Sequence, residues 1–176
     1  MAELIKGENY VLFFREYAKR ATEDAAKLRF QTEHSLSFEK ESEATKTKDG
    51  MINTITDGEN SGDITSLAYA NDDDTIETWK TLRDMFKRNA LVEMWEVDFT
   101  GATKDQLKVE PTYYQGYFNS FEISAPADDK VELSFGFAIN GNGVTGEDTL
   151  TASQLAAVKS GLYEYHKLAK EAGSNV

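Results

Sequence analysis

The residues of this chain that could do chemistry begin with a glycine-rich motif, GNGVTG, at positions 141–146. Its spacing matches G-x-G-x-x-G, with which a loop between a strand and a helix binds the pyrophosphate of a dinucleotide. That site needs a second strand after the helix, but residues 147–176 indicate only a helix and a tail. Glu147 and Asp148 would also place negative charge where pyrophosphate needs positive potential. We therefore interpret the motif as a turn with positive φ at glycines, which ends the last strand and leads into the C-terminal helix.

Other catalytic and metal-binding chemistries lack the residues that they need. The chain has no Cys and two His, and no serine stands in G-x-S-x-G. His34 falls on the apolar side of a predicted strand, which indicates a half-buried, hydrogen-bonded side chain, and His166 is predicted on the surface of the last helix. The NDDD run at 71–74 lacks the spacing of a calcium loop and is better explained as a helix cap. Nothing places two carboxylates at the separation that glycoside hydrolysis requires, so we expect no enzyme activity, metal or cofactor.

The charge balance narrows the possible partners. There are 31 Asp and Glu residues against 19 Lys and Arg, and the net charge is -12. Such a chain repels nucleic acids and anionic membranes at long range. With 176 residues, of which 40% are hydrophobic, we expect one domain with its own core. No apolar run is long enough to span a bilayer or to resemble a signal peptide, so we expect a soluble protein made in the cytoplasm.

Alternating hydrophobicity predicts a mainly antiparallel β-fold. The clearest case is residues 27–38, in which apolar side chains share one face: Leu28, Phe30, Leu36 and Phe38. Further strands are expected at 9–18, 64–70, 91–99, 112–124 and 130–140. Helical spacing predicts a helix at 71–89, supported by an Asp84–Arg88 pair, and another at 151–172, which starts with a capping box. Because strands and helices do not alternate regularly, we expect an antiparallel β-sandwich or barrel with one long helix packed at its side and a C-terminal helix.

One segment stands apart because its composition is polar. Residues 39–63 contain the turn signals DG and SG. A structureless loop of that length is unusual inside a compact domain. We therefore expect a projecting loop or hairpin, or a segment that a partner orders. It belongs to a single domain that spans residues 1–176 and starts with an arm at 1–8.

Five stretches extend from the N-terminus to about Gln154: MAELIKGENYVLFFR, AAKLRFQTEHSLSFEKESE, TKTKDG, LVEMWEVD and TYYQGYFNSFEISAPADDKVELSFGFAINGNGVTGEDTLTASQ. In this order and spacing they resemble the major tail tube protein of long-tailed (siphovirus-type) phages of Gram-positive bacteria. The resemblance implies a non-enzymatic protein that forms hexameric rings, and rings that stack into a tube through which DNA leaves the virion. It also implies assembly in the host cytoplasm, with tail terminator, distal tail and tape measure proteins as partners and without a membrane.

Given this resemblance, the polar strand faces become candidates for the lumen of the tube. An acidic, hydroxyl-rich wall is a surface to which DNA does not adhere, so DNA would pass without specific binding. The candidate lumen-facing residues are Glu33, Ser35, Ser37, Glu39, Ser120, Glu122, Glu132 and Ser134. The projecting segment and the arm at 2–8 are candidates for contact between rings, and the candidate ring-stacking residues are Lys46, Lys48, Asp49, Met51, Ile52, Asp57 and Glu59.

An alternative of another class is a soluble carbohydrate-binding or hydrolytic β-sandwich domain. Trp95 and the tyrosines would then form a platform for a sugar. We favour the interpretation of Trp79 and Trp95 as core residues. Self-assembly of the purified chain would distinguish the two classes.

Overall fold

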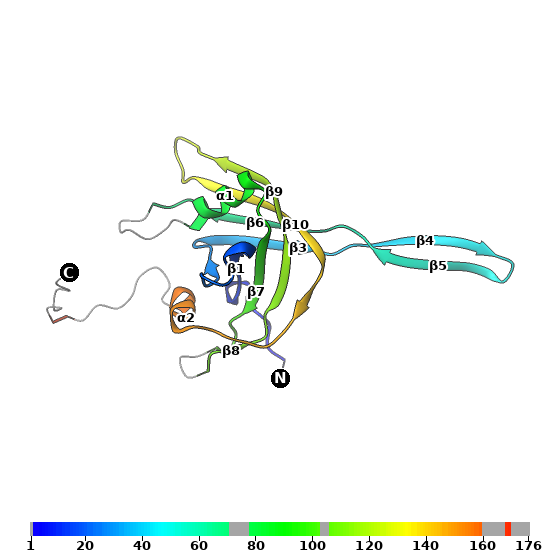
Figure 1. Ribbon diagram of the computed structural model, residues 1–176, viewed down its shortest axis with the longest axis horizontal. Helices are drawn as coiled ribbons and strands as arrows, with labels where there is room; N and C mark the ends of the chain where they lie inside the picture. Colours follow the sequence, from blue (N-terminus) through cyan, green and yellow to red (C-terminus); the bar gives the residue numbers. More distant parts are fainter. Residues whose placement is uncertain (1, 71–77, 103–105, 160–167, 170–176) are drawn as a thin grey trace.

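The computed structural model describes residues 2–70, 78–102, 106–159 and 168–169 (Figure 1). Short 3-10 helices at Gly7–Asn9 and Tyr17–Lys19 flank the first strand. The strands and helices are β1 (Tyr10–Glu16), β2 (Ala26–Lys27), β3 (Gln31–Ser37), β4 (Lys40–Thr47), β5 (Gly50–Asp57), β6 (Asn60–Leu67), α1 (Thr78–Arg88), β7 (Val92–Asp98), β8 (Lys108–Val109), β9 (Thr112–Ser124), β10 (Glu132–Thr145), β11 (Asp148–Thr149) and α2 (Ala152–Lys159).

One curled sheet forms the body of the molecule. Its seven strands follow the order β2-β1-β7-β9-β10-β6-β3, and its strand pairs are antiparallel. The curl brings the two ends of the sheet together: the Gln31 side chain on β3 donates to the Leu12 carbonyl on β1 at 3.0 Å and accepts from the Leu12 N–H at 3.3 Å. The expected fold class, mainly β and antiparallel with flanking helices, is confirmed.

Two cores lie on opposite faces of β1. Leu12 and Phe14 point into the curl, where a central core gathers apolar side chains from β1, β3, β6, β7, β9, β10 and α1. Val11 and Phe13 point outward into a second core, which Leu155 of α2 helps to cover. β1 is therefore buried on both faces, whereas no second core among the described residues covers the outer face of β3, β6, β10 and β9.

The helix α1 contributes Trp79, Leu82 and Met85 to the central core. The expected pair between Asp84 and Arg88 is present at 2.8 Å, and the helix ends before Asn89, whose φ of 54° is left-handed. The part of the predicted helix at 71–77, including the NDDD run, lies outside the described residues.

The second helix is shorter than expected. The capping box is confirmed, because the Gln154 N–H donates to Thr151 Oγ1 at 3.1 Å and the Thr151 N–H donates to Gln154 Oε1 at 3.0 Å. However, α2 is described only to Lys159, and Leu168 and Ala169 form a bend rather than the helix predicted to reach residue 172. His166 lies outside the described residues.

The predicted strand at 27–38 is broken. Phe30 has a φ of 57°, and the pairing of β3 with β6 shifts between Gln31 and Glu33, so β2 and β3 are separate strands. Phe38 lies beyond the end of β3, where its ring stacks on Tyr114 at 5.8 Å and stays half exposed. The turn at Phe30 lets β2 pair with β1 while β3 pairs with β6, and periodicity alone does not reveal it.

The glycine motif is not the corner that we expected. β10 continues through it to Thr145, and the β9–β10 register shifts between Asn140 and Val144, so the motif is a bulge within the strand. Positive φ is confirmed at Gly141 and Gly143, at 68° and 77°. A Cβ at Gly143 would lie 2.4 Å from the Tyr114 ring, so the bulge requires glycine there.

Candidate assembly surfaces

The outer face of β3, β6, β10 and β9 is mostly polar, with Ala138 and Tyr117 in the row of Ser37 and Ser61, and we call its polar residues the polar face. Strand register aligns its residues in rows. One row runs from Glu33 through Thr65 and Ser134 to Glu122. The next contains Ser35, Asp63, Gly136 and Ser120. The polar face comprises Glu33, Ser35, Ser37, Ser61, Asp63, Thr65, Ser120, Glu122, Glu132 and Ser134.

The opposite side of these strands is the central core. Ile64, Phe135 and Phe137, which alternate with polar-face residues, are at most 1% exposed. Residues of the polar face are exposed or half-buried. Register and burial thus bring seven of the eight candidate lumen residues onto one face. Glu39 lies past the end of β3, outside these rows.

The charge of the polar face has one sign. It carries four carboxylates, which belong to Glu33, Asp63, Glu122 and Glu132. The four strands that form this face, β3, β6, β9 and β10, contain no Lys or Arg. Ser61, Asp63 and Thr65 of β6 were missed in the sequence. Their alternation with Gly62, Ile64 and Ser66 could have identified them, but a polar composition up to residue 63 favoured a projecting loop.

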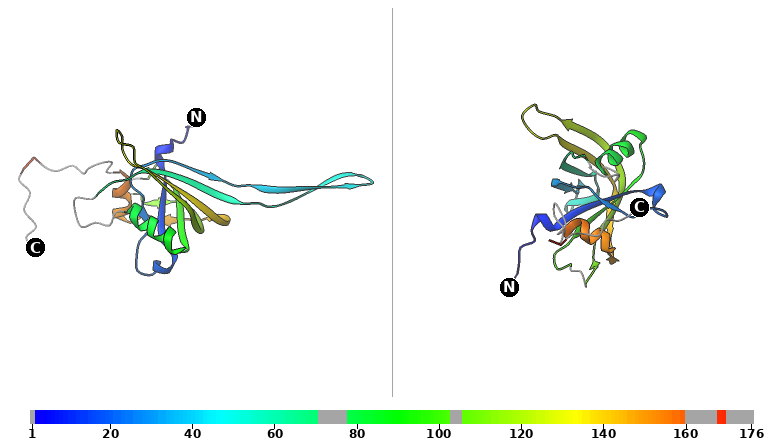
Figure 2. Two further views of the ribbon diagram at one scale, coloured as in Figure 1. Left: turned by 90° about the horizontal axis from the view of Figure 1, so that it is seen from above. Right: turned by 90° about the vertical axis from the view of Figure 1, so that its left-hand side faces the viewer.

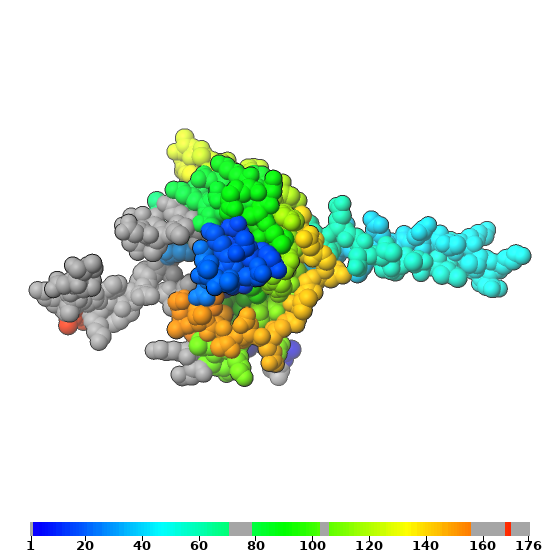
Figure 3. Space-filling view, viewed as in Figure 1, coloured from blue at the N-terminus to red at the C-terminus, as the bar shows by residue number. Residues whose placement is uncertain are grey.

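The polar segment forms a hairpin. In Figures 1 and 2, β4 and β5 extend from the body as a narrow ribbon, and in Figure 3 this ribbon stands clear of the body. All of residues 40–57 are exposed except Thr47, which is half-buried. Met51, Ile52 and Ile55 are 60%, 57% and 58% exposed. Such side chains contribute little to the fold and remain available for contact.

The two faces of the hairpin differ in chemistry. Paired residues share a face in an antiparallel ladder, so Lys46 lies with Met51, and Ser42 lies with Ile55. This lysine face comprises Lys40, Ser42, Ala44, Lys46, Met51, Asn53, Ile55 and Asp57. The opposite glutamate face comprises Glu41, Glu43, Thr45, Thr47, Gly50, Ile52, Thr54 and Thr56.

The candidate stacking residues therefore lie in several places. Lys46, Met51 and Asp57 are on the lysine face and Ile52 is on the glutamate face. Lys48 and Asp49 form the turn, which Thr47 closes by donating from its hydroxyl to the Gly50 carbonyl at 2.7 Å. Glu59 lies in the link to β6. Ile55 was not predicted from the sequence, although its exposure is nearly the same as that of Ile52.

A family model described as phage tail tube protein matches residues 4–145. The chain belongs to the phage tail tube protein family. A putative tail protein of Staphylococcus phage phiMR25 is 29% identical over 172 residues, which cover 97% of this chain and 86% of that protein.

Solved structures agree on the fold of this tail tube protein. A subunit of the SPP1 tail tube matches with a TM-score of 0.74 and 18% identity, over 97% of this chain and 96% of that one. A subunit from the tail of an empty GTA particle matches with a TM-score of 0.56 and 10% identity, over 84% and 100% of the two chains. The resemblance is confirmed, and the family is structural rather than enzymatic. The protein is a component of the virion tail.

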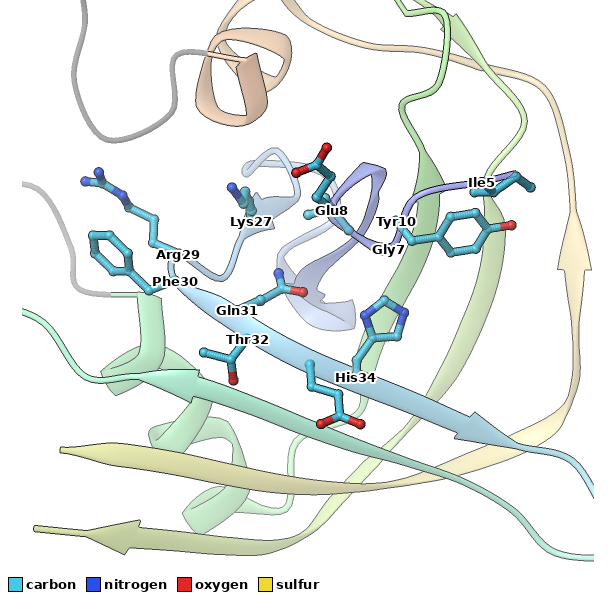
Figure 4. Close-up of a pocket in the computed structure, with 12 residues that line it drawn as sticks. Ile5, Gly7, Glu8, Tyr10, Lys27, Arg29, Phe30, Gln31, Thr32 and His34 are labelled. Carbon is cyan, nitrogen blue, oxygen red and sulfur yellow. The ribbon is translucent and has the colours of Figure 1, made fainter. Parts of the chain in front are cut away.

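A groove of about 850 Å³ lies between the N-terminal arm of the tail tube protein and β2–β3 (Figure 4). Its polar side chains hold the fold together. Gln31 binds the backbone of β1, and His34 Nε2 lies 2.8 Å from Glu96 Oε2 on β7. The expectation that His34 is half-buried and hydrogen-bonded is confirmed.

The two tryptophans pack against the protein and do not form an exposed platform for a sugar. Trp79 is 8% exposed and donates to the Tyr69 carbonyl at 2.8 Å. Trp95 is half-buried against the second core, with the Arg15 guanidinium 5.0 Å from its ring. The interpretation as a core residue is confirmed for Trp79, whereas Trp95 is only partly buried at the border of the second core. Within the described residues, no group of three or more possible metal ligands is found, and neither helix is long and apolar enough to cross a membrane.

Proposed function

We propose that this tail tube protein forms hexameric rings that stack into the phage tail tube, and that DNA leaves the particle through an acidic lumen. The family and the fold support a tube subunit. Six-fold symmetry is stated for the GTA tail, whose subunit has the same fold. In this proposal the chain assembles in the host cytoplasm, without a membrane. The tail terminator, distal tail and tape measure proteins are its partners.

The observation that carries the proposal is the polar face. A soluble protein can solvate its surface with charges of either sign, yet four neighbouring strands present carboxylates and hydroxyls with no Lys or Arg. A phosphate backbone is repelled by such a wall and finds no cation to bind. DNA would therefore slide past it without specific contacts. Glu39, beyond the end of β3, would lie at the rim.

Ring closure follows from the ends of the sheet. β3 is an edge strand, and β2 covers β1 at only Phe13 and Phe14. Open strand edges invite pairing with another chain. A closed ring satisfies this pairing with identical subunits and leaves no edge for uncontrolled growth.

The hairpin would join one ring to the next, together with the N-terminal arm at 2–8. A two-stranded hairpin is marginally stable alone, so a partner should cover one of its faces. The lysine face fits better than the glutamate face, because Met51 and Ile55 offer apolar area while Lys46 complements an acidic neighbour. The net charge of -12 makes a second copy of the chain such a neighbour. Ile55 therefore joins the candidate stacking residues.

Charge reversal on the polar face tests the lumen. In phage that carry Glu33→Lys, Glu122→Lys and Glu132→Lys together, we expect normal tails but slower DNA ejection, because DNA now binds to the wall. The matched control changes the same charge at three exposed positions outside the polar face, Glu23→Lys, Glu110→Lys and Glu147→Lys. Ejection that is unchanged by the first set, or slowed equally by both, would contradict an electrostatic role for this face.

A further inference from the structure

The root of the hairpin is built around one buried amide, the side chain of Asn60. This residue is 7% exposed. Its Oδ1 accepts from the Glu39 N–H at 3.1 Å. Its Nδ2 donates to the Gly141 carbonyl at 2.6 Å and to Asn142 Oδ1 at 3.0 Å. One side chain thus joins the β3–β4 link, the start of β6 and the glycine bulge of β10.

The backbone at this root is irregular. Ser37 pairs with Ser61 at the end of the sheet, and Lys40 pairs with Asp57 at the start of the hairpin. Residues 38–39 on one strand therefore face residues 58–60 on the other, which is the arrangement of a β-bulge. A bulge bends the ladder, so the direction of the hairpin depends on how this bulge is held.

A second contact reaches the first pair of the hairpin. Asn142 Nδ2 donates to Asp57 Oδ2 at 3.2 Å, and Asp57 also pairs with Lys40. Hydrogen bonds from Lys40 and Asn142 hold the pKa of Asp57 below its ordinary value. The hairpin is thus tied to β10 on the hairpin side of the bulge as well as within it.

The glycine motif supplies the β10 side of these contacts. Positive φ at Gly141 and Gly143 takes Asn142 out of the regular β9–β10 pairing. The side chain of Asn142 is exposed and belongs to neither core. Its hydrogen bonds go to the hairpin root instead.

We propose that Asn60 and Asn142 form a clamp that fixes the angle at which the hairpin leaves the sheet. This inference rests on the proposed role of the hairpin in joining rings. A hairpin held in one orientation loses less conformational freedom when it docks on the next ring, so each joint forms at a lower protein concentration. The GNGVTG motif then serves assembly rather than ligand binding.

The angle can be measured directly, because the chain has no Cys and introduced thiols are unique. Spin labels at Asp49→Cys in the hairpin turn and Ser124→Cys at the end of β9 report the distance between hairpin and body by electron paramagnetic resonance. We expect one narrow distribution in the otherwise unchanged protein. Asn60→Asp keeps the oxygen that accepts from the Glu39 N–H but loses both donated hydrogen bonds. Asn142→Ala loses the hydrogen bond to Asp57. Both variants should therefore broaden the distance distribution. Asn140→Ala, an exposed amide on the same strand, is the control and should leave it narrow.

Polymerisation provides the functional readout. In the unlabelled chain, Asn60→Asp and Asn142→Ala should each raise the protein concentration needed for tubes about tenfold, because a hairpin that is free to move loses more conformational freedom when it docks. If Asn60→Asp unfolds, Asn142→Ala still tests the clamp, because the Asn142 side chain is exposed and its removal should not unfold the protein. Distributions as narrow in Asn142→Ala as in the parent would overturn the clamp. Normal tubes without a hairpin would instead overturn its role between rings, with the distance result unaffected.

Discussion

The sheet and the hairpin of this protein are both antiparallel ribbons, but they are held in place by different forces. Phe135 and Phe137 of β10 are 1% and 0% exposed, whereas Met51 and Ile55 of β5 are 60% and 58% exposed. The sheet buries its apolar side chains and is stabilised by them. The hairpin is stabilised only by its backbone hydrogen-bond ladder and by the contacts at its root. Apolar residues in the sheet therefore stabilise the fold, whereas those in the hairpin are available for contact with another subunit.

The largest effect should come from removing the hairpin. Replacing residues 43–54 with Asn-Gly leaves Ser42 and Ile55 joined by a two-residue turn and keeps the root intact. We expect complete loss of tubes in negative-stain microscopy, because ring contacts are gone. The midpoint of urea unfolding should stay unchanged, since no core residue is removed. Normal tubes from this variant would show that the hairpin is dispensable for stacking.

The next effect concerns stability and is confined to the sheet. Phe137→Ala leaves a cavity in the central core and should lower the free energy of unfolding by about 3–5 kcal/mol. Met51→Ala, an exposed position on the hairpin, should change it by no more than about 0.5 kcal/mol. Urea titrations of the two monomers measure both values. Equal losses would mean that the hairpin packs against the body in solution.

The two faces of the hairpin give a finer test. Ile52 and Ile55 have nearly equal exposure on opposite faces of β5, so each is the control for the other. Ile55→Ser should raise the protein concentration needed for tubes about tenfold, because apolar area on the lysine face is buried between rings. Ile52→Ser should have little effect. Sedimentation of tubes over a concentration series measures both, and the reverse order would assign the contact to the glutamate face.

The smallest effect compares carboxylates in the two regions. The hydrogen bonds from Arg88 hold the pKa of Glu16 below its ordinary value, and Glu16 is buried in the body, whereas Asp57 is exposed on the hairpin. A carboxylate with a lowered pKa contributes stability above its unfolded pKa and loses that contribution as the pH falls through its folded pKa.

Between pH 5 and pH 3, the parent should therefore lose about 1 kcal/mol more stability than Glu16→Gln, a modest value because Arg88 is half exposed. Asp57→Asn should differ from the parent less than Glu16→Gln does over this range, because Asp57 is exposed and solvent screens its contacts with Lys40 and Asn142. Unfolding titrations at the two pH values provide the comparison. Parallel losses in the parent and Glu16→Gln would show that this ion pair does not stabilise the fold.

The polar face could be predicted because its signal is local. Alternation in β3, β9 and β10 assigned Glu33, Ser120 and Ser134 to one side of their strands, and antiparallel pairing then aligned those sides. On β6, Asp63 obeys the same alternation. It was missed because the polar composition of the neighbouring hairpin extended the predicted projection into the strand.

The glycine bulge and the hairpin root could not be predicted, because they depend on contacts between distant residues. Asn60 and Gly141 are 81 positions apart, and nothing in either segment indicates the other. The same holds for Phe30, whose left-handed turn sends β2 and β3 to different partner strands. The positive φ of the glycines in the motif could be predicted, but the contacts of the Asn142 side chain between them could not.

The most direct measurement is a helical reconstruction, by electron cryomicroscopy, of tubes grown from the purified chain. We expect six subunits per ring, with Glu33, Asp63 and Glu122 lining the lumen and the lysine face of each hairpin against the adjacent ring. Polar-face side chains on the outer wall of the tube would contradict this expectation. So would a chain that stays monomeric at all concentrations and binds an oligosaccharide instead.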